Sequence, residues 1–207
     1  SAPLVEDIIN QYPFDFILYD LEHGTLNVEA IEESLRICRI VDLPTVVRVP
    51  DSSPNFISKT LDMGADGILL PRVETLEQVE IAIKSGKYFP KGRKGCGGFS
   101  NFKVDDELSV YEYNDNRMIF IQIESQEGFV VLQDILDNYK EEIDGVIIGP
   151  YDASIMLGTP LDIDSDVMVD FIKNVFTVCK VNGVSSGIFL EHGSMMQGYR
   201  DLGANIF

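Results

Sequence analysis

The chain has 207 residues, 45% of them hydrophobic, which is enough apolar material to bury one full core. Its formal net charge is −18, from 34 acidic and 16 basic side chains. Nucleic acids and anionic membrane surfaces are bound through clusters of Lys and Arg, and the sequence shows no such cluster. We therefore expect neither nucleic acid nor membrane as a partner.

The three cysteines, Cys38, Cys96 and Cys179, are odd in number and widely spaced. No CxxC pair or zinc-binding spacing occurs, which favours a reducing, cytoplasmic compartment. No apolar run approaches the roughly 18–20 residues of a membrane span, and the N-terminus lacks a basic-then-apolar signal pattern.

Short apolar runs recur along the chain, each closed by a polar or glycine turn. They are nearly continuous and rich in Ile, Val and Phe, which is typical of parallel strands covered on both faces. The predicted strands are 14–20, 45–49, 66–71, 118–124, 144–150, 186–190 and 204–207.

Segments with helical spacing of apolar residues separate these runs. The predicted helices are Ala2–Gln11, Val28–Val41, Asn55–Met63, Thr75–Gly86, Glu127–Tyr139, Asp166–Asn182 and Ser194–Leu202. Several are followed by a glycine suited to a left-handed C-cap, as at Gly64, Gly183 and Gly203. Strands alternating with helices predict right-handed βαβ units and a parallel sheet.

Two architectures compete for this pattern, a doubly wound open sheet and a closed (β/α)8 barrel. An open sheet usually carries a glycine-rich phosphate-binding turn after its first strand, and none occurs here. The glycine-rich stretch 94–98 follows a helix instead, and we interpret it as a loop or lid. The sequence therefore favours one barrel domain over residues 1–207.

A complete barrel typically needs about 250 residues. The chain opens inside a predicted helix and stops within an apolar run at Phe207. We expect a barrel whose first strand and last helix are absent from this chain.

Polar residues follow several predicted strands where the strands end. In a parallel barrel these ends meet at one mouth, where the chemistry takes place. The residues in question are Asp20, Glu22, His23, Arg48, Gln122, Glu124 and Asp152.

Glu124 and Asp152 each follow an Ile-rich run. Two carboxylates at one mouth repel each other unless a cation or a proton joins them, and hard oxygen ligands suit Mg²⁺ or Mn²⁺. The alternative is that both are solvated loop acids, which are common in a chain this acidic.

Two further residues have two interpretations each, and a third has one. Arg48 either pairs with a core acid such as Asp20 or holds a substrate carboxylate or enolate oxygen. His23 is either a proton-transfer group or a loop histidine bonded to a nearby carboxylate. Asp62, near the end of a helix, is by placement alone a surface acid.

Six stretches together resemble one known family. They are FDFILYDLEHG (14–24), VVRVP (46–50), LDMGADGILLPRVET (61–75), FPKGRKG (89–95), IQIES (121–125) and DGVIIGPYDAS (144–154). In this order they resemble the HpcH/HpaI aldolase/citrate lyase family, and within it the class II pyruvate aldolases. The resemblance implies a (β/α)8 barrel and a homo-oligomer, usually a hexamer, in which the last helix packs on a neighbouring subunit.

The resemblance also assigns catalytic and metal roles. Glu124 and Asp152 fall on the family's metal ligands, for Mg²⁺ first, with Mn²⁺ and Co²⁺ as alternatives. Arg48 falls on the arginine that stabilises the pyruvate enolate. His23 falls on the histidine tied to the catalytic water, and Asp62 on its acidic partner.

Substrate contacts are implied in the same way. Gln122 falls near the bound keto acid, and the backbone around Gly149, Tyr151 and Asp152 falls where the substrate carboxylate is held. Asp20 falls on an acid of the same site. Tyr151, the segment 95–116 and the stretch 159–161 depart from the family pattern, which leaves the aldehyde acceptor unassigned.

The implied reaction is metal-dependent aldol cleavage or addition of a 4-hydroxy-2-keto acid, giving pyruvate and an aldehyde through a metal-stabilised enolate. No lysine takes part, so no Schiff base is expected. One alternative is a CoA-ester lyase of the citrate-lyase type, which the low Lys and Arg content disfavours. Another is a barrel that binds a ligand without catalysis, which the four intact residues His23, Arg48, Glu124 and Asp152 disfavour.

Overall fold

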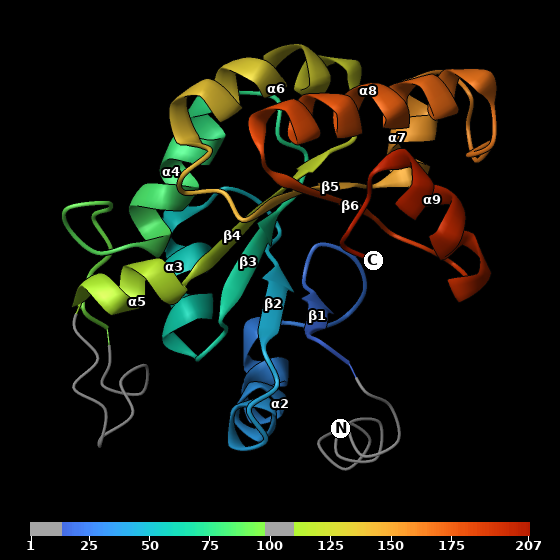
Figure 1. Cartoon of the computed structure of the whole chain (residues 1–207). Coiled ribbons are helices and arrows are strands. Elements are labelled where there is room, and N and C mark those ends of the chain that lie inside the picture. The colour runs from blue at the N-terminus through green and yellow to red at the C-terminus, as the bar shows by residue number, and fades with distance from the viewer. Residues whose placement is uncertain (1–13, 98–109) are drawn as a thin grey trace. The chain divides into compact units, whose positions relative to one another are not determined.

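The structure is a computed structural model, and it describes residues 14–97 and 110–207 (Figure 1). The predicted helix Ala2–Gln11 and the end of the glycine-rich stretch, Gly98, lie outside the described residues. The chain divides into two compact units. Unit 1 comprises Ser1–Leu70 and Ile81–Met118, and unit 2 comprises Pro71–Glu80 and Ile119–Phe207.

Strands and helices alternate along the described chain. In order they are β1 (Ile17–Asp20), α2 (Val28–Ile40), β2 (Thr45–Arg48), α3 (Pro54–Asp62), β3 (Gly67–Leu70), α4 (Leu76–Gly86), α5 (Val110–Asn116), β4 (Met118–Ile123), α6 (Gln126–Tyr139), β5 (Gly145–Ile148), α7 (Pro150–Met156), α8 (Asp166–Asn182), β6 (Ser185–Ile188), the 3₁₀ turn η2 (Gly193–Met195) and α9 (Met196–Leu202).

Unit 1 contains three parallel strands in the order β1-β2-β3. Ile17 lies opposite Thr45 and Asp20 opposite Arg48, while Val46 lies opposite Gly67. All four residues of β3 are buried, as expected for a strand covered on both faces. The core of this unit is aliphatic and comes from α2, β2, α3 and β3, with Ile31, Leu35, Val47, Ile57, Leu61 and Ile68 among its buried side chains.

Unit 2 contains the parallel strands β4, β5 and β6. Phe120 lies opposite Gly145, which in turn lies opposite Ser185. Helices α6 and α8 pack side by side (Figure 1), and the Phe129 and Phe171 rings meet edge to face with centroids 6.0 Å apart. The buried side chains of this core include Ile121, Ile123, Leu132, Leu136, Val146, Ile148, Ile172 and Phe176.

Polar side chains at helix starts explain where several helices begin. Asn27 Oδ1 accepts a hydrogen bond from Ala30 N at 2.8 Å before α2, and Ser125 Oγ accepts one from Gly128 N at 3.1 Å before α6. These N-caps satisfy amide groups that the helix itself leaves unpaired. Helix α8 ends at Gly183, whose φ of 72° is the left-handed conformation that favours glycine.

The predicted alternation of strands and helices is confirmed for the described residues. Six predicted runs form strands, and all the strand pairs within each unit are parallel. The seventh run, 204–207, contributes only a single parallel bridge between Ile206 and Gly187. The predicted helices within the described residues form with ends no more than two residues from those expected.

Two helices differ from expectation. Helix α7 begins at Pro150, the last residue of a predicted strand run, and occupies a segment for which no helix is predicted; proline at the first helical position fits such a start. Helix α5 lies in the segment 95–116, where Tyr113 and Asn114 are buried. Among the described residues, no helix combines the length and apolarity needed to cross a membrane.

The carboxylate of Asp66 joins the amino ends of β2 and β3. Its Oδ2 accepts hydrogen bonds from Thr45 N at 2.9 Å and Thr45 Oγ1 at 3.1 Å, and its Oδ1 accepts one from Arg117 Nη1 at 3.3 Å. Thr45 is buried, so its amide depends on this carboxylate for an acceptor.

We predict that Asp66→Ala lowers the free energy of unfolding by about 1–3 kcal/mol, because the buried amide of Thr45 loses its acceptor. Urea denaturation followed by circular dichroism measures this loss. The exposed Asp134, on α6, supplies the matched control, and Asp134→Ala should change stability by less than about 0.5 kcal/mol. Equal effects of the two substitutions would contradict the role given to Asp66.

Candidate active site

An arginine at the carboxyl end of β2 pairs with acids that end and follow β1. The parallel register sets Arg48 opposite Asp20, so their side chains meet. Arg48 donates from Nε to Asp20 Oδ1 at 2.9 Å and from Nη2 to Asp20 Oδ2 at 2.6 Å. Its Nη1 lies 3.2 Å from Glu22 Oε2. Arg48 therefore pairs with Asp20, which is one of the two interpretations given by its sequence position.

Charge in this cluster is not balanced by Arg48 alone. The Arg48 side chain is 11% exposed and that of Glu22 is 7% exposed, so water screens them little. Burial opposes ionisation of Asp20, but the hydrogen bonds and positive charge of Arg48 outweigh it and hold the pKa of Asp20 below its ordinary value. One cation thus faces two carboxylates.

His23 follows the same strand but points to solvent, with half of its side chain exposed. Its Nε2 lies 3.7 Å from Glu22 Oε2, and its main-chain N–H donates to Asp20 Oδ1 at 3.3 Å. Within unit 1, His23 is a loop histidine beside a carboxylate, which is one of the two interpretations given by its sequence position. An exposed imidazole there remains open to a substrate or to another chain.

Asp62 lies at the other end of the strands. It is the last residue of α3 and precedes β3, so it sits on the amino-terminal side of the sheet, whereas His23 and Arg48 lie on the carboxyl-terminal side. A four-residue strand is about 10 Å long. Unit 1 therefore does not bring Asp62 to His23. Its carboxylate accepts a short hydrogen bond from Lys94 Nζ instead.

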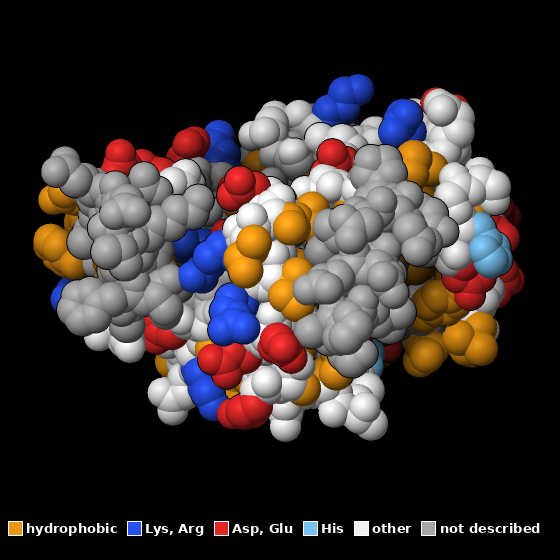
Figure 2. Space-filling view, turned by 90° about the horizontal axis from the view of Figure 1, so that it is seen from below, with side chains coloured by type: hydrophobic (Ala, Val, Ile, Leu, Met, Phe, Trp, Pro, Cys, Tyr) orange, Lys and Arg blue, Asp and Glu red, His pale blue; other side chains and the backbone are white. Residues whose placement is uncertain are grey.

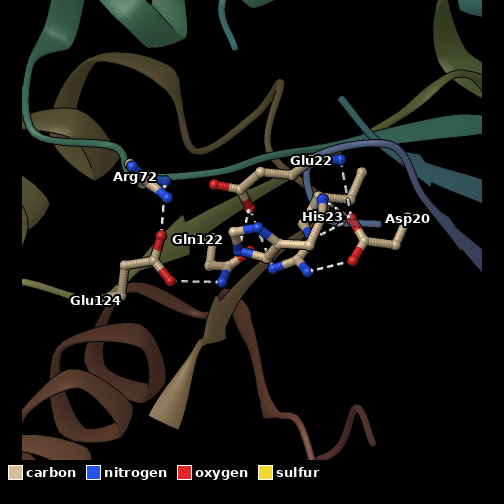
Figure 3. A network of polar contacts seen from close by, with 7 residues as sticks. Asp20, Glu22, His23, Arg72, Gln122 and Glu124 are labelled. Atoms are coloured by element: carbon tan, nitrogen blue, oxygen red, sulfur yellow. Dashed lines mark hydrogen bonds and ion pairs between the residues drawn. The ribbon is translucent and has the colours of Figure 1, made fainter. Parts of the chain in front are cut away.

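In unit 2, a buried carboxylate follows β4. Glu124 is 3% exposed, and Figure 3 shows it between the Arg72 main chain and the Gln122 side chain. Glu124 Oε1 accepts from Arg72 N at 3.1 Å, and Oε2 accepts from the Gln122 amide at 2.6 Å. Arg72 has φ of 50°, a conformation that is rare for a residue with a side chain. The strained conformation of Arg72 directs its main-chain N–H toward the Glu124 carboxylate.

Gly149 brings the backbone after β5 against the same two side chains. A methyl group at this position would overlap both the Gln122 amide nitrogen and Glu124 Oε2. Gly149 is the N-cap residue of α7, whose first turn carries Tyr151 and the half-buried Asp152. Predicted substrate and metal residues on β4, Gly149 and α7 therefore belong to one unit.

Tyr151 is exposed and bonds to an acid that follows the neighbouring strand. A hydrogen bond to Glu191, with a smaller contribution from burial, raises the pKa of the Tyr151 phenol. Glu191 comes three residues after β6, the strand that pairs with β5. The position at which this sequence departs from the family pattern therefore carries a phenol–carboxylate pair.

The donor set of unit 2 fits a hard divalent cation. In the described parts of the chain, no three His, Cys, Asp or Glu side chains group closely enough to hold a metal by themselves. Mg²⁺ in proteins commonly uses only one or two carboxylates, with water and substrate oxygens completing its octahedron. A carboxylate has roughly four lone-pair positions, so Glu124 can accept hydrogen bonds and bind a cation at the same time.

Three contributions were not predicted from the sequence. Glu22 was recognised as a strand-end residue but given no role, and Arg72 acts through its main chain, which no side-chain pattern reveals. Lys94 lies in the glycine-rich stretch interpreted as a loop. Its place within FPKGRKG (89–95), one of the six stretches that resemble the family, is the one sequence feature that could have drawn attention to it.

The surface carries basic side chains that mostly lie beside acidic ones, as Figure 2 shows for one face. Lys59 Nζ lies 2.5 Å from Glu29 Oε1, and Lys91 Nζ lies 3.1 Å from Asp115 Oδ1. Such exposed pairs contribute little to stability.

Comparison with known proteins relates the whole chain to one family. The profile of the family described as HpcH/HpaI aldolase/citrate lyase matches residues 1–207. The hydroxypyruvate/pyruvate aldolase of Roseovarius nubinhibens is 28% identical over 209 residues, which cover 99% of this chain and 80% of that protein. The 5-keto-4-deoxy-D-glucarate aldolase of Escherichia coli K12 is 29% identical over 206 residues, with coverage of 99% and 80%.

Solved structures agree with the sequence comparison. The HpcH/HpaI aldolase from Desulfitobacterium hafniense DCB-2 superimposes with a TM-score of 0.91 and 25% identity, and the match covers all of this chain and 80% of that one.

We predict that the ion pair of Asp20 makes stability depend on pH in the acid range. The folded-state pKa is lowered, so the pair stabilises the fold above the ordinary carboxyl pKa of about 4 and this contribution is lost as the pH falls through the folded-state value. The difference in unfolding free energy between wild type and Asp20→Asn should be constant from about pH 7 to about pH 5 and shrink below about pH 4. A difference that stays constant down to acid unfolding would contradict the assignment.

We predict that Gly149→Ala displaces Glu124 and Gln122, because the new methyl group takes their space. The cost in unfolding free energy should be about 1–3 kcal/mol, measured by urea denaturation. Gly198, on α9, has open space around it and gives the matched control. Gly198→Ala should be neutral or slightly stabilising, and equal destabilisation by both would count against the close approach at Gly149.

Proposed function

Because the chain belongs to the HpcH/HpaI aldolase/citrate lyase family, we propose that it carries out metal-dependent aldol cleavage and addition of a 4-hydroxy-2-keto acid. The products of cleavage are pyruvate and an aldehyde. That it is an enzyme of carbon–carbon bond cleavage follows from its aldolase relatives. The proposal adds the metal, the (β/α)8 barrel as the complete fold, and the roles of individual residues.

The buried carboxylate of Glu124 is the observation that carries this proposal. It follows the carboxyl end of β4, accepts from an amide and a strained main-chain N–H, and lies close to the backbone of Gly149, where a methyl group would overlap it. We assign Glu124 and Asp152 as ligands of one divalent cation, Mg²⁺ first. When bound, this cation would supply Lewis acidity toward the keto and carboxylate oxygens of the substrate.

The charge balance explains why a cation is needed. The substrate is an anion and the chain carries a net charge of −18. Arg48 already faces Asp20 and Glu22, so its charge alone does not offset a bound keto acid. A divalent cation provides the missing positive charge locally.

The chain's own residues supply the remaining chemistry. Cleavage breaks the bond between C3 and C4, its electron pair becomes the pyruvate enolate, and the C4 hydroxyl loses its proton to give the aldehyde. Arg48 donates hydrogen bonds to the developing enolate oxygen. His23 accepts the proton of the C4 hydroxyl during cleavage and returns it to the same oxygen during addition. Gln122 and the backbone at Gly149, Tyr151 and Asp152 orient the keto acid.

The position of Asp62 supports a homo-oligomer. Asp62 lies on the amino-terminal side of unit 1 and His23 on the carboxyl-terminal side, so the pairing implied by the family resemblance requires two chains. We propose that Asp62 of one copy reaches His23 of another. A hexamer, as implied by the resemblance, provides such contacts.

The test is deuterium exchange into the methyl group of pyruvate in D₂O, followed by NMR. The wild type should exchange with Mg²⁺ or Mn²⁺ and stop on chelation. Glu124→Ala should abolish exchange, and Arg48→Lys should slow it about 10²-fold or more. Glu127, exposed in the first turn of α6, gives the matched control. Metal-independent exchange, or exchange equal in Glu124→Ala and Glu127→Ala, would refute the proposal.

Shared sites predict complementation between impaired variants. His23→Ala and Asp62→Asn should each keep only a small, measurable residue of aldol-cleavage activity, and co-assembled mixtures should regain a fraction of wild-type activity because some sites receive both native residues. Pyruvate release, coupled to lactate dehydrogenase, measures this recovery. Mixtures that show no recovery although the subunits exchange would contradict the shared site.

A further inference from the structure

A lysine outside the proposed chemistry is fully enclosed in unit 1. The Lys94 side chain has 0% of its surface exposed, and its ammonium group donates to the carboxylate of Asp62 and to Gly95 O, the latter at 3.2 Å. The nitrogen also lies 5.1 Å from the centre of the Tyr88 ring. Burying a charged ammonium group away from water costs free energy unless an opposite charge is close to it. The Asp62 carboxylate supplies that opposite charge for Lys94.

The main chain around Lys94 is built to hold that geometry. Lys94 N donates to Lys87 O at 2.9 Å, which closes the loop after α4. The amide of the buried Asn114 accepts from Tyr88 N at 2.6 Å and donates to Tyr88 O at 2.9 Å. These bonds fix the segment that carries both the Tyr88 ring and the Lys94 stem.

A neighbouring cation stabilises the ionised carboxylate of Asp62. It is the last residue of α3, where the partial negative charge of the helix end disfavours a carboxylate. A methyl group at Gly97 would overlap its Oδ2, so the chain passes close to this carboxylate on a second side. Asp62 is nevertheless a quarter exposed, which leaves one part of it accessible from outside unit 1.

We propose that Lys94 is a positioning residue that holds the Asp62 carboxylate in the orientation in which it acts on His23 of another chain. The proposal rests on the proposed function and extends it to a residue without substrate contact. Lys94 remains an ammonium ion throughout and forms no covalent bond. It acts only by fixing Asp62 and by offsetting its charge.

The kinetic test uses the full chain with metal. Lys94→Met keeps the length of the stem and removes the charge, and kcat for aldol cleavage should fall about 10–100-fold while KM changes less than about threefold, as expected for a misplaced group. Lys94→Arg should restore most of kcat. Lys91, which forms an exposed pair three residues earlier, is the matched control, and Lys91→Met should leave kcat unchanged.

A double-mutant cycle separates positioning from mere structural support. If Lys94 acts through Asp62, the variant with both Lys94→Met and Asp62→Asn should be no slower than Asp62→Asn alone. Multiplying effects, or a kcat of Lys94→Met within threefold of wild type, would overturn the proposal. In subunit mixtures, Lys94→Met should complement His23→Ala but not Asp62→Asn, and complementation of Asp62→Asn would also overturn it.

A measurement on the resting protein covers the case in which Lys94→Met fails to fold. A buried, paired ammonium exchanges its protons slowly, so ¹H–¹⁵N NMR should show a Lys side-chain signal that Asp62→Asn removes and Lys91→Met does not. Absence of this signal from the wild type overturns the pairing. A wild type without metal-dependent exchange refutes the proposed function and this role together, whereas normal exchange with an unaffected Lys94→Met refutes only the role of Lys94.

Discussion

A carboxylate enclosed at the end of a strand needs hydrogen-bond donors or a cation in place of water, and this requirement at Glu124 organises the residues around it. The strained φ of Arg72, the amide of Gln122 and the glycine at position 149 all serve the same two oxygens. They carry costs in backbone strain and buried polarity, and the cation site proposed for Glu124 would account for them.

The two edges of the parallel sheet in unit 1 carry different ion pairs. At the carboxyl ends, Arg48 is shared by Asp20 and Glu22. At the amino side, Lys94 and Asp62 form a pair of opposite charges. The first arrangement joins one guanidinium to two carboxylates, whereas the second joins one ammonium to one carboxylate. The two cations also have different proposed roles: Arg48 contacts the reacting substrate, whereas Lys94 only positions Asp62.

Much of this arrangement could be predicted from the sequence because strands buried on both faces appear as short, nearly continuous apolar runs. The runs that became β3 and β5 are wholly buried, and the residues that follow β1, β2, β4 and β5 were identified as site candidates from their strand ends alone. Helix α7 is not predicted because it follows β5 after a single residue and begins at Pro150, which the apolar run 144–150 places in the strand. The Arg72 N–H was missed because its role belongs to the backbone. Lys94 was missed because burial of a lysine depends on contacts distant in sequence, here with Asp62.

The central claim, that Glu124 is a ligand of a catalytic divalent cation, is tested most directly by Mn²⁺ binding followed by electron paramagnetic resonance, without any substrate turnover. The wild type should bind one Mn²⁺ per chain, and bind it more tightly with pyruvate present. Glu124→Gln keeps the shape of the side chain and removes its charge. It should weaken Mn²⁺ binding roughly 100-fold or more, since even residues that only hydrogen-bond to a metal ligand change metal affinity about 10–100-fold. Equal Mn²⁺ affinity in the two proteins would contradict the account.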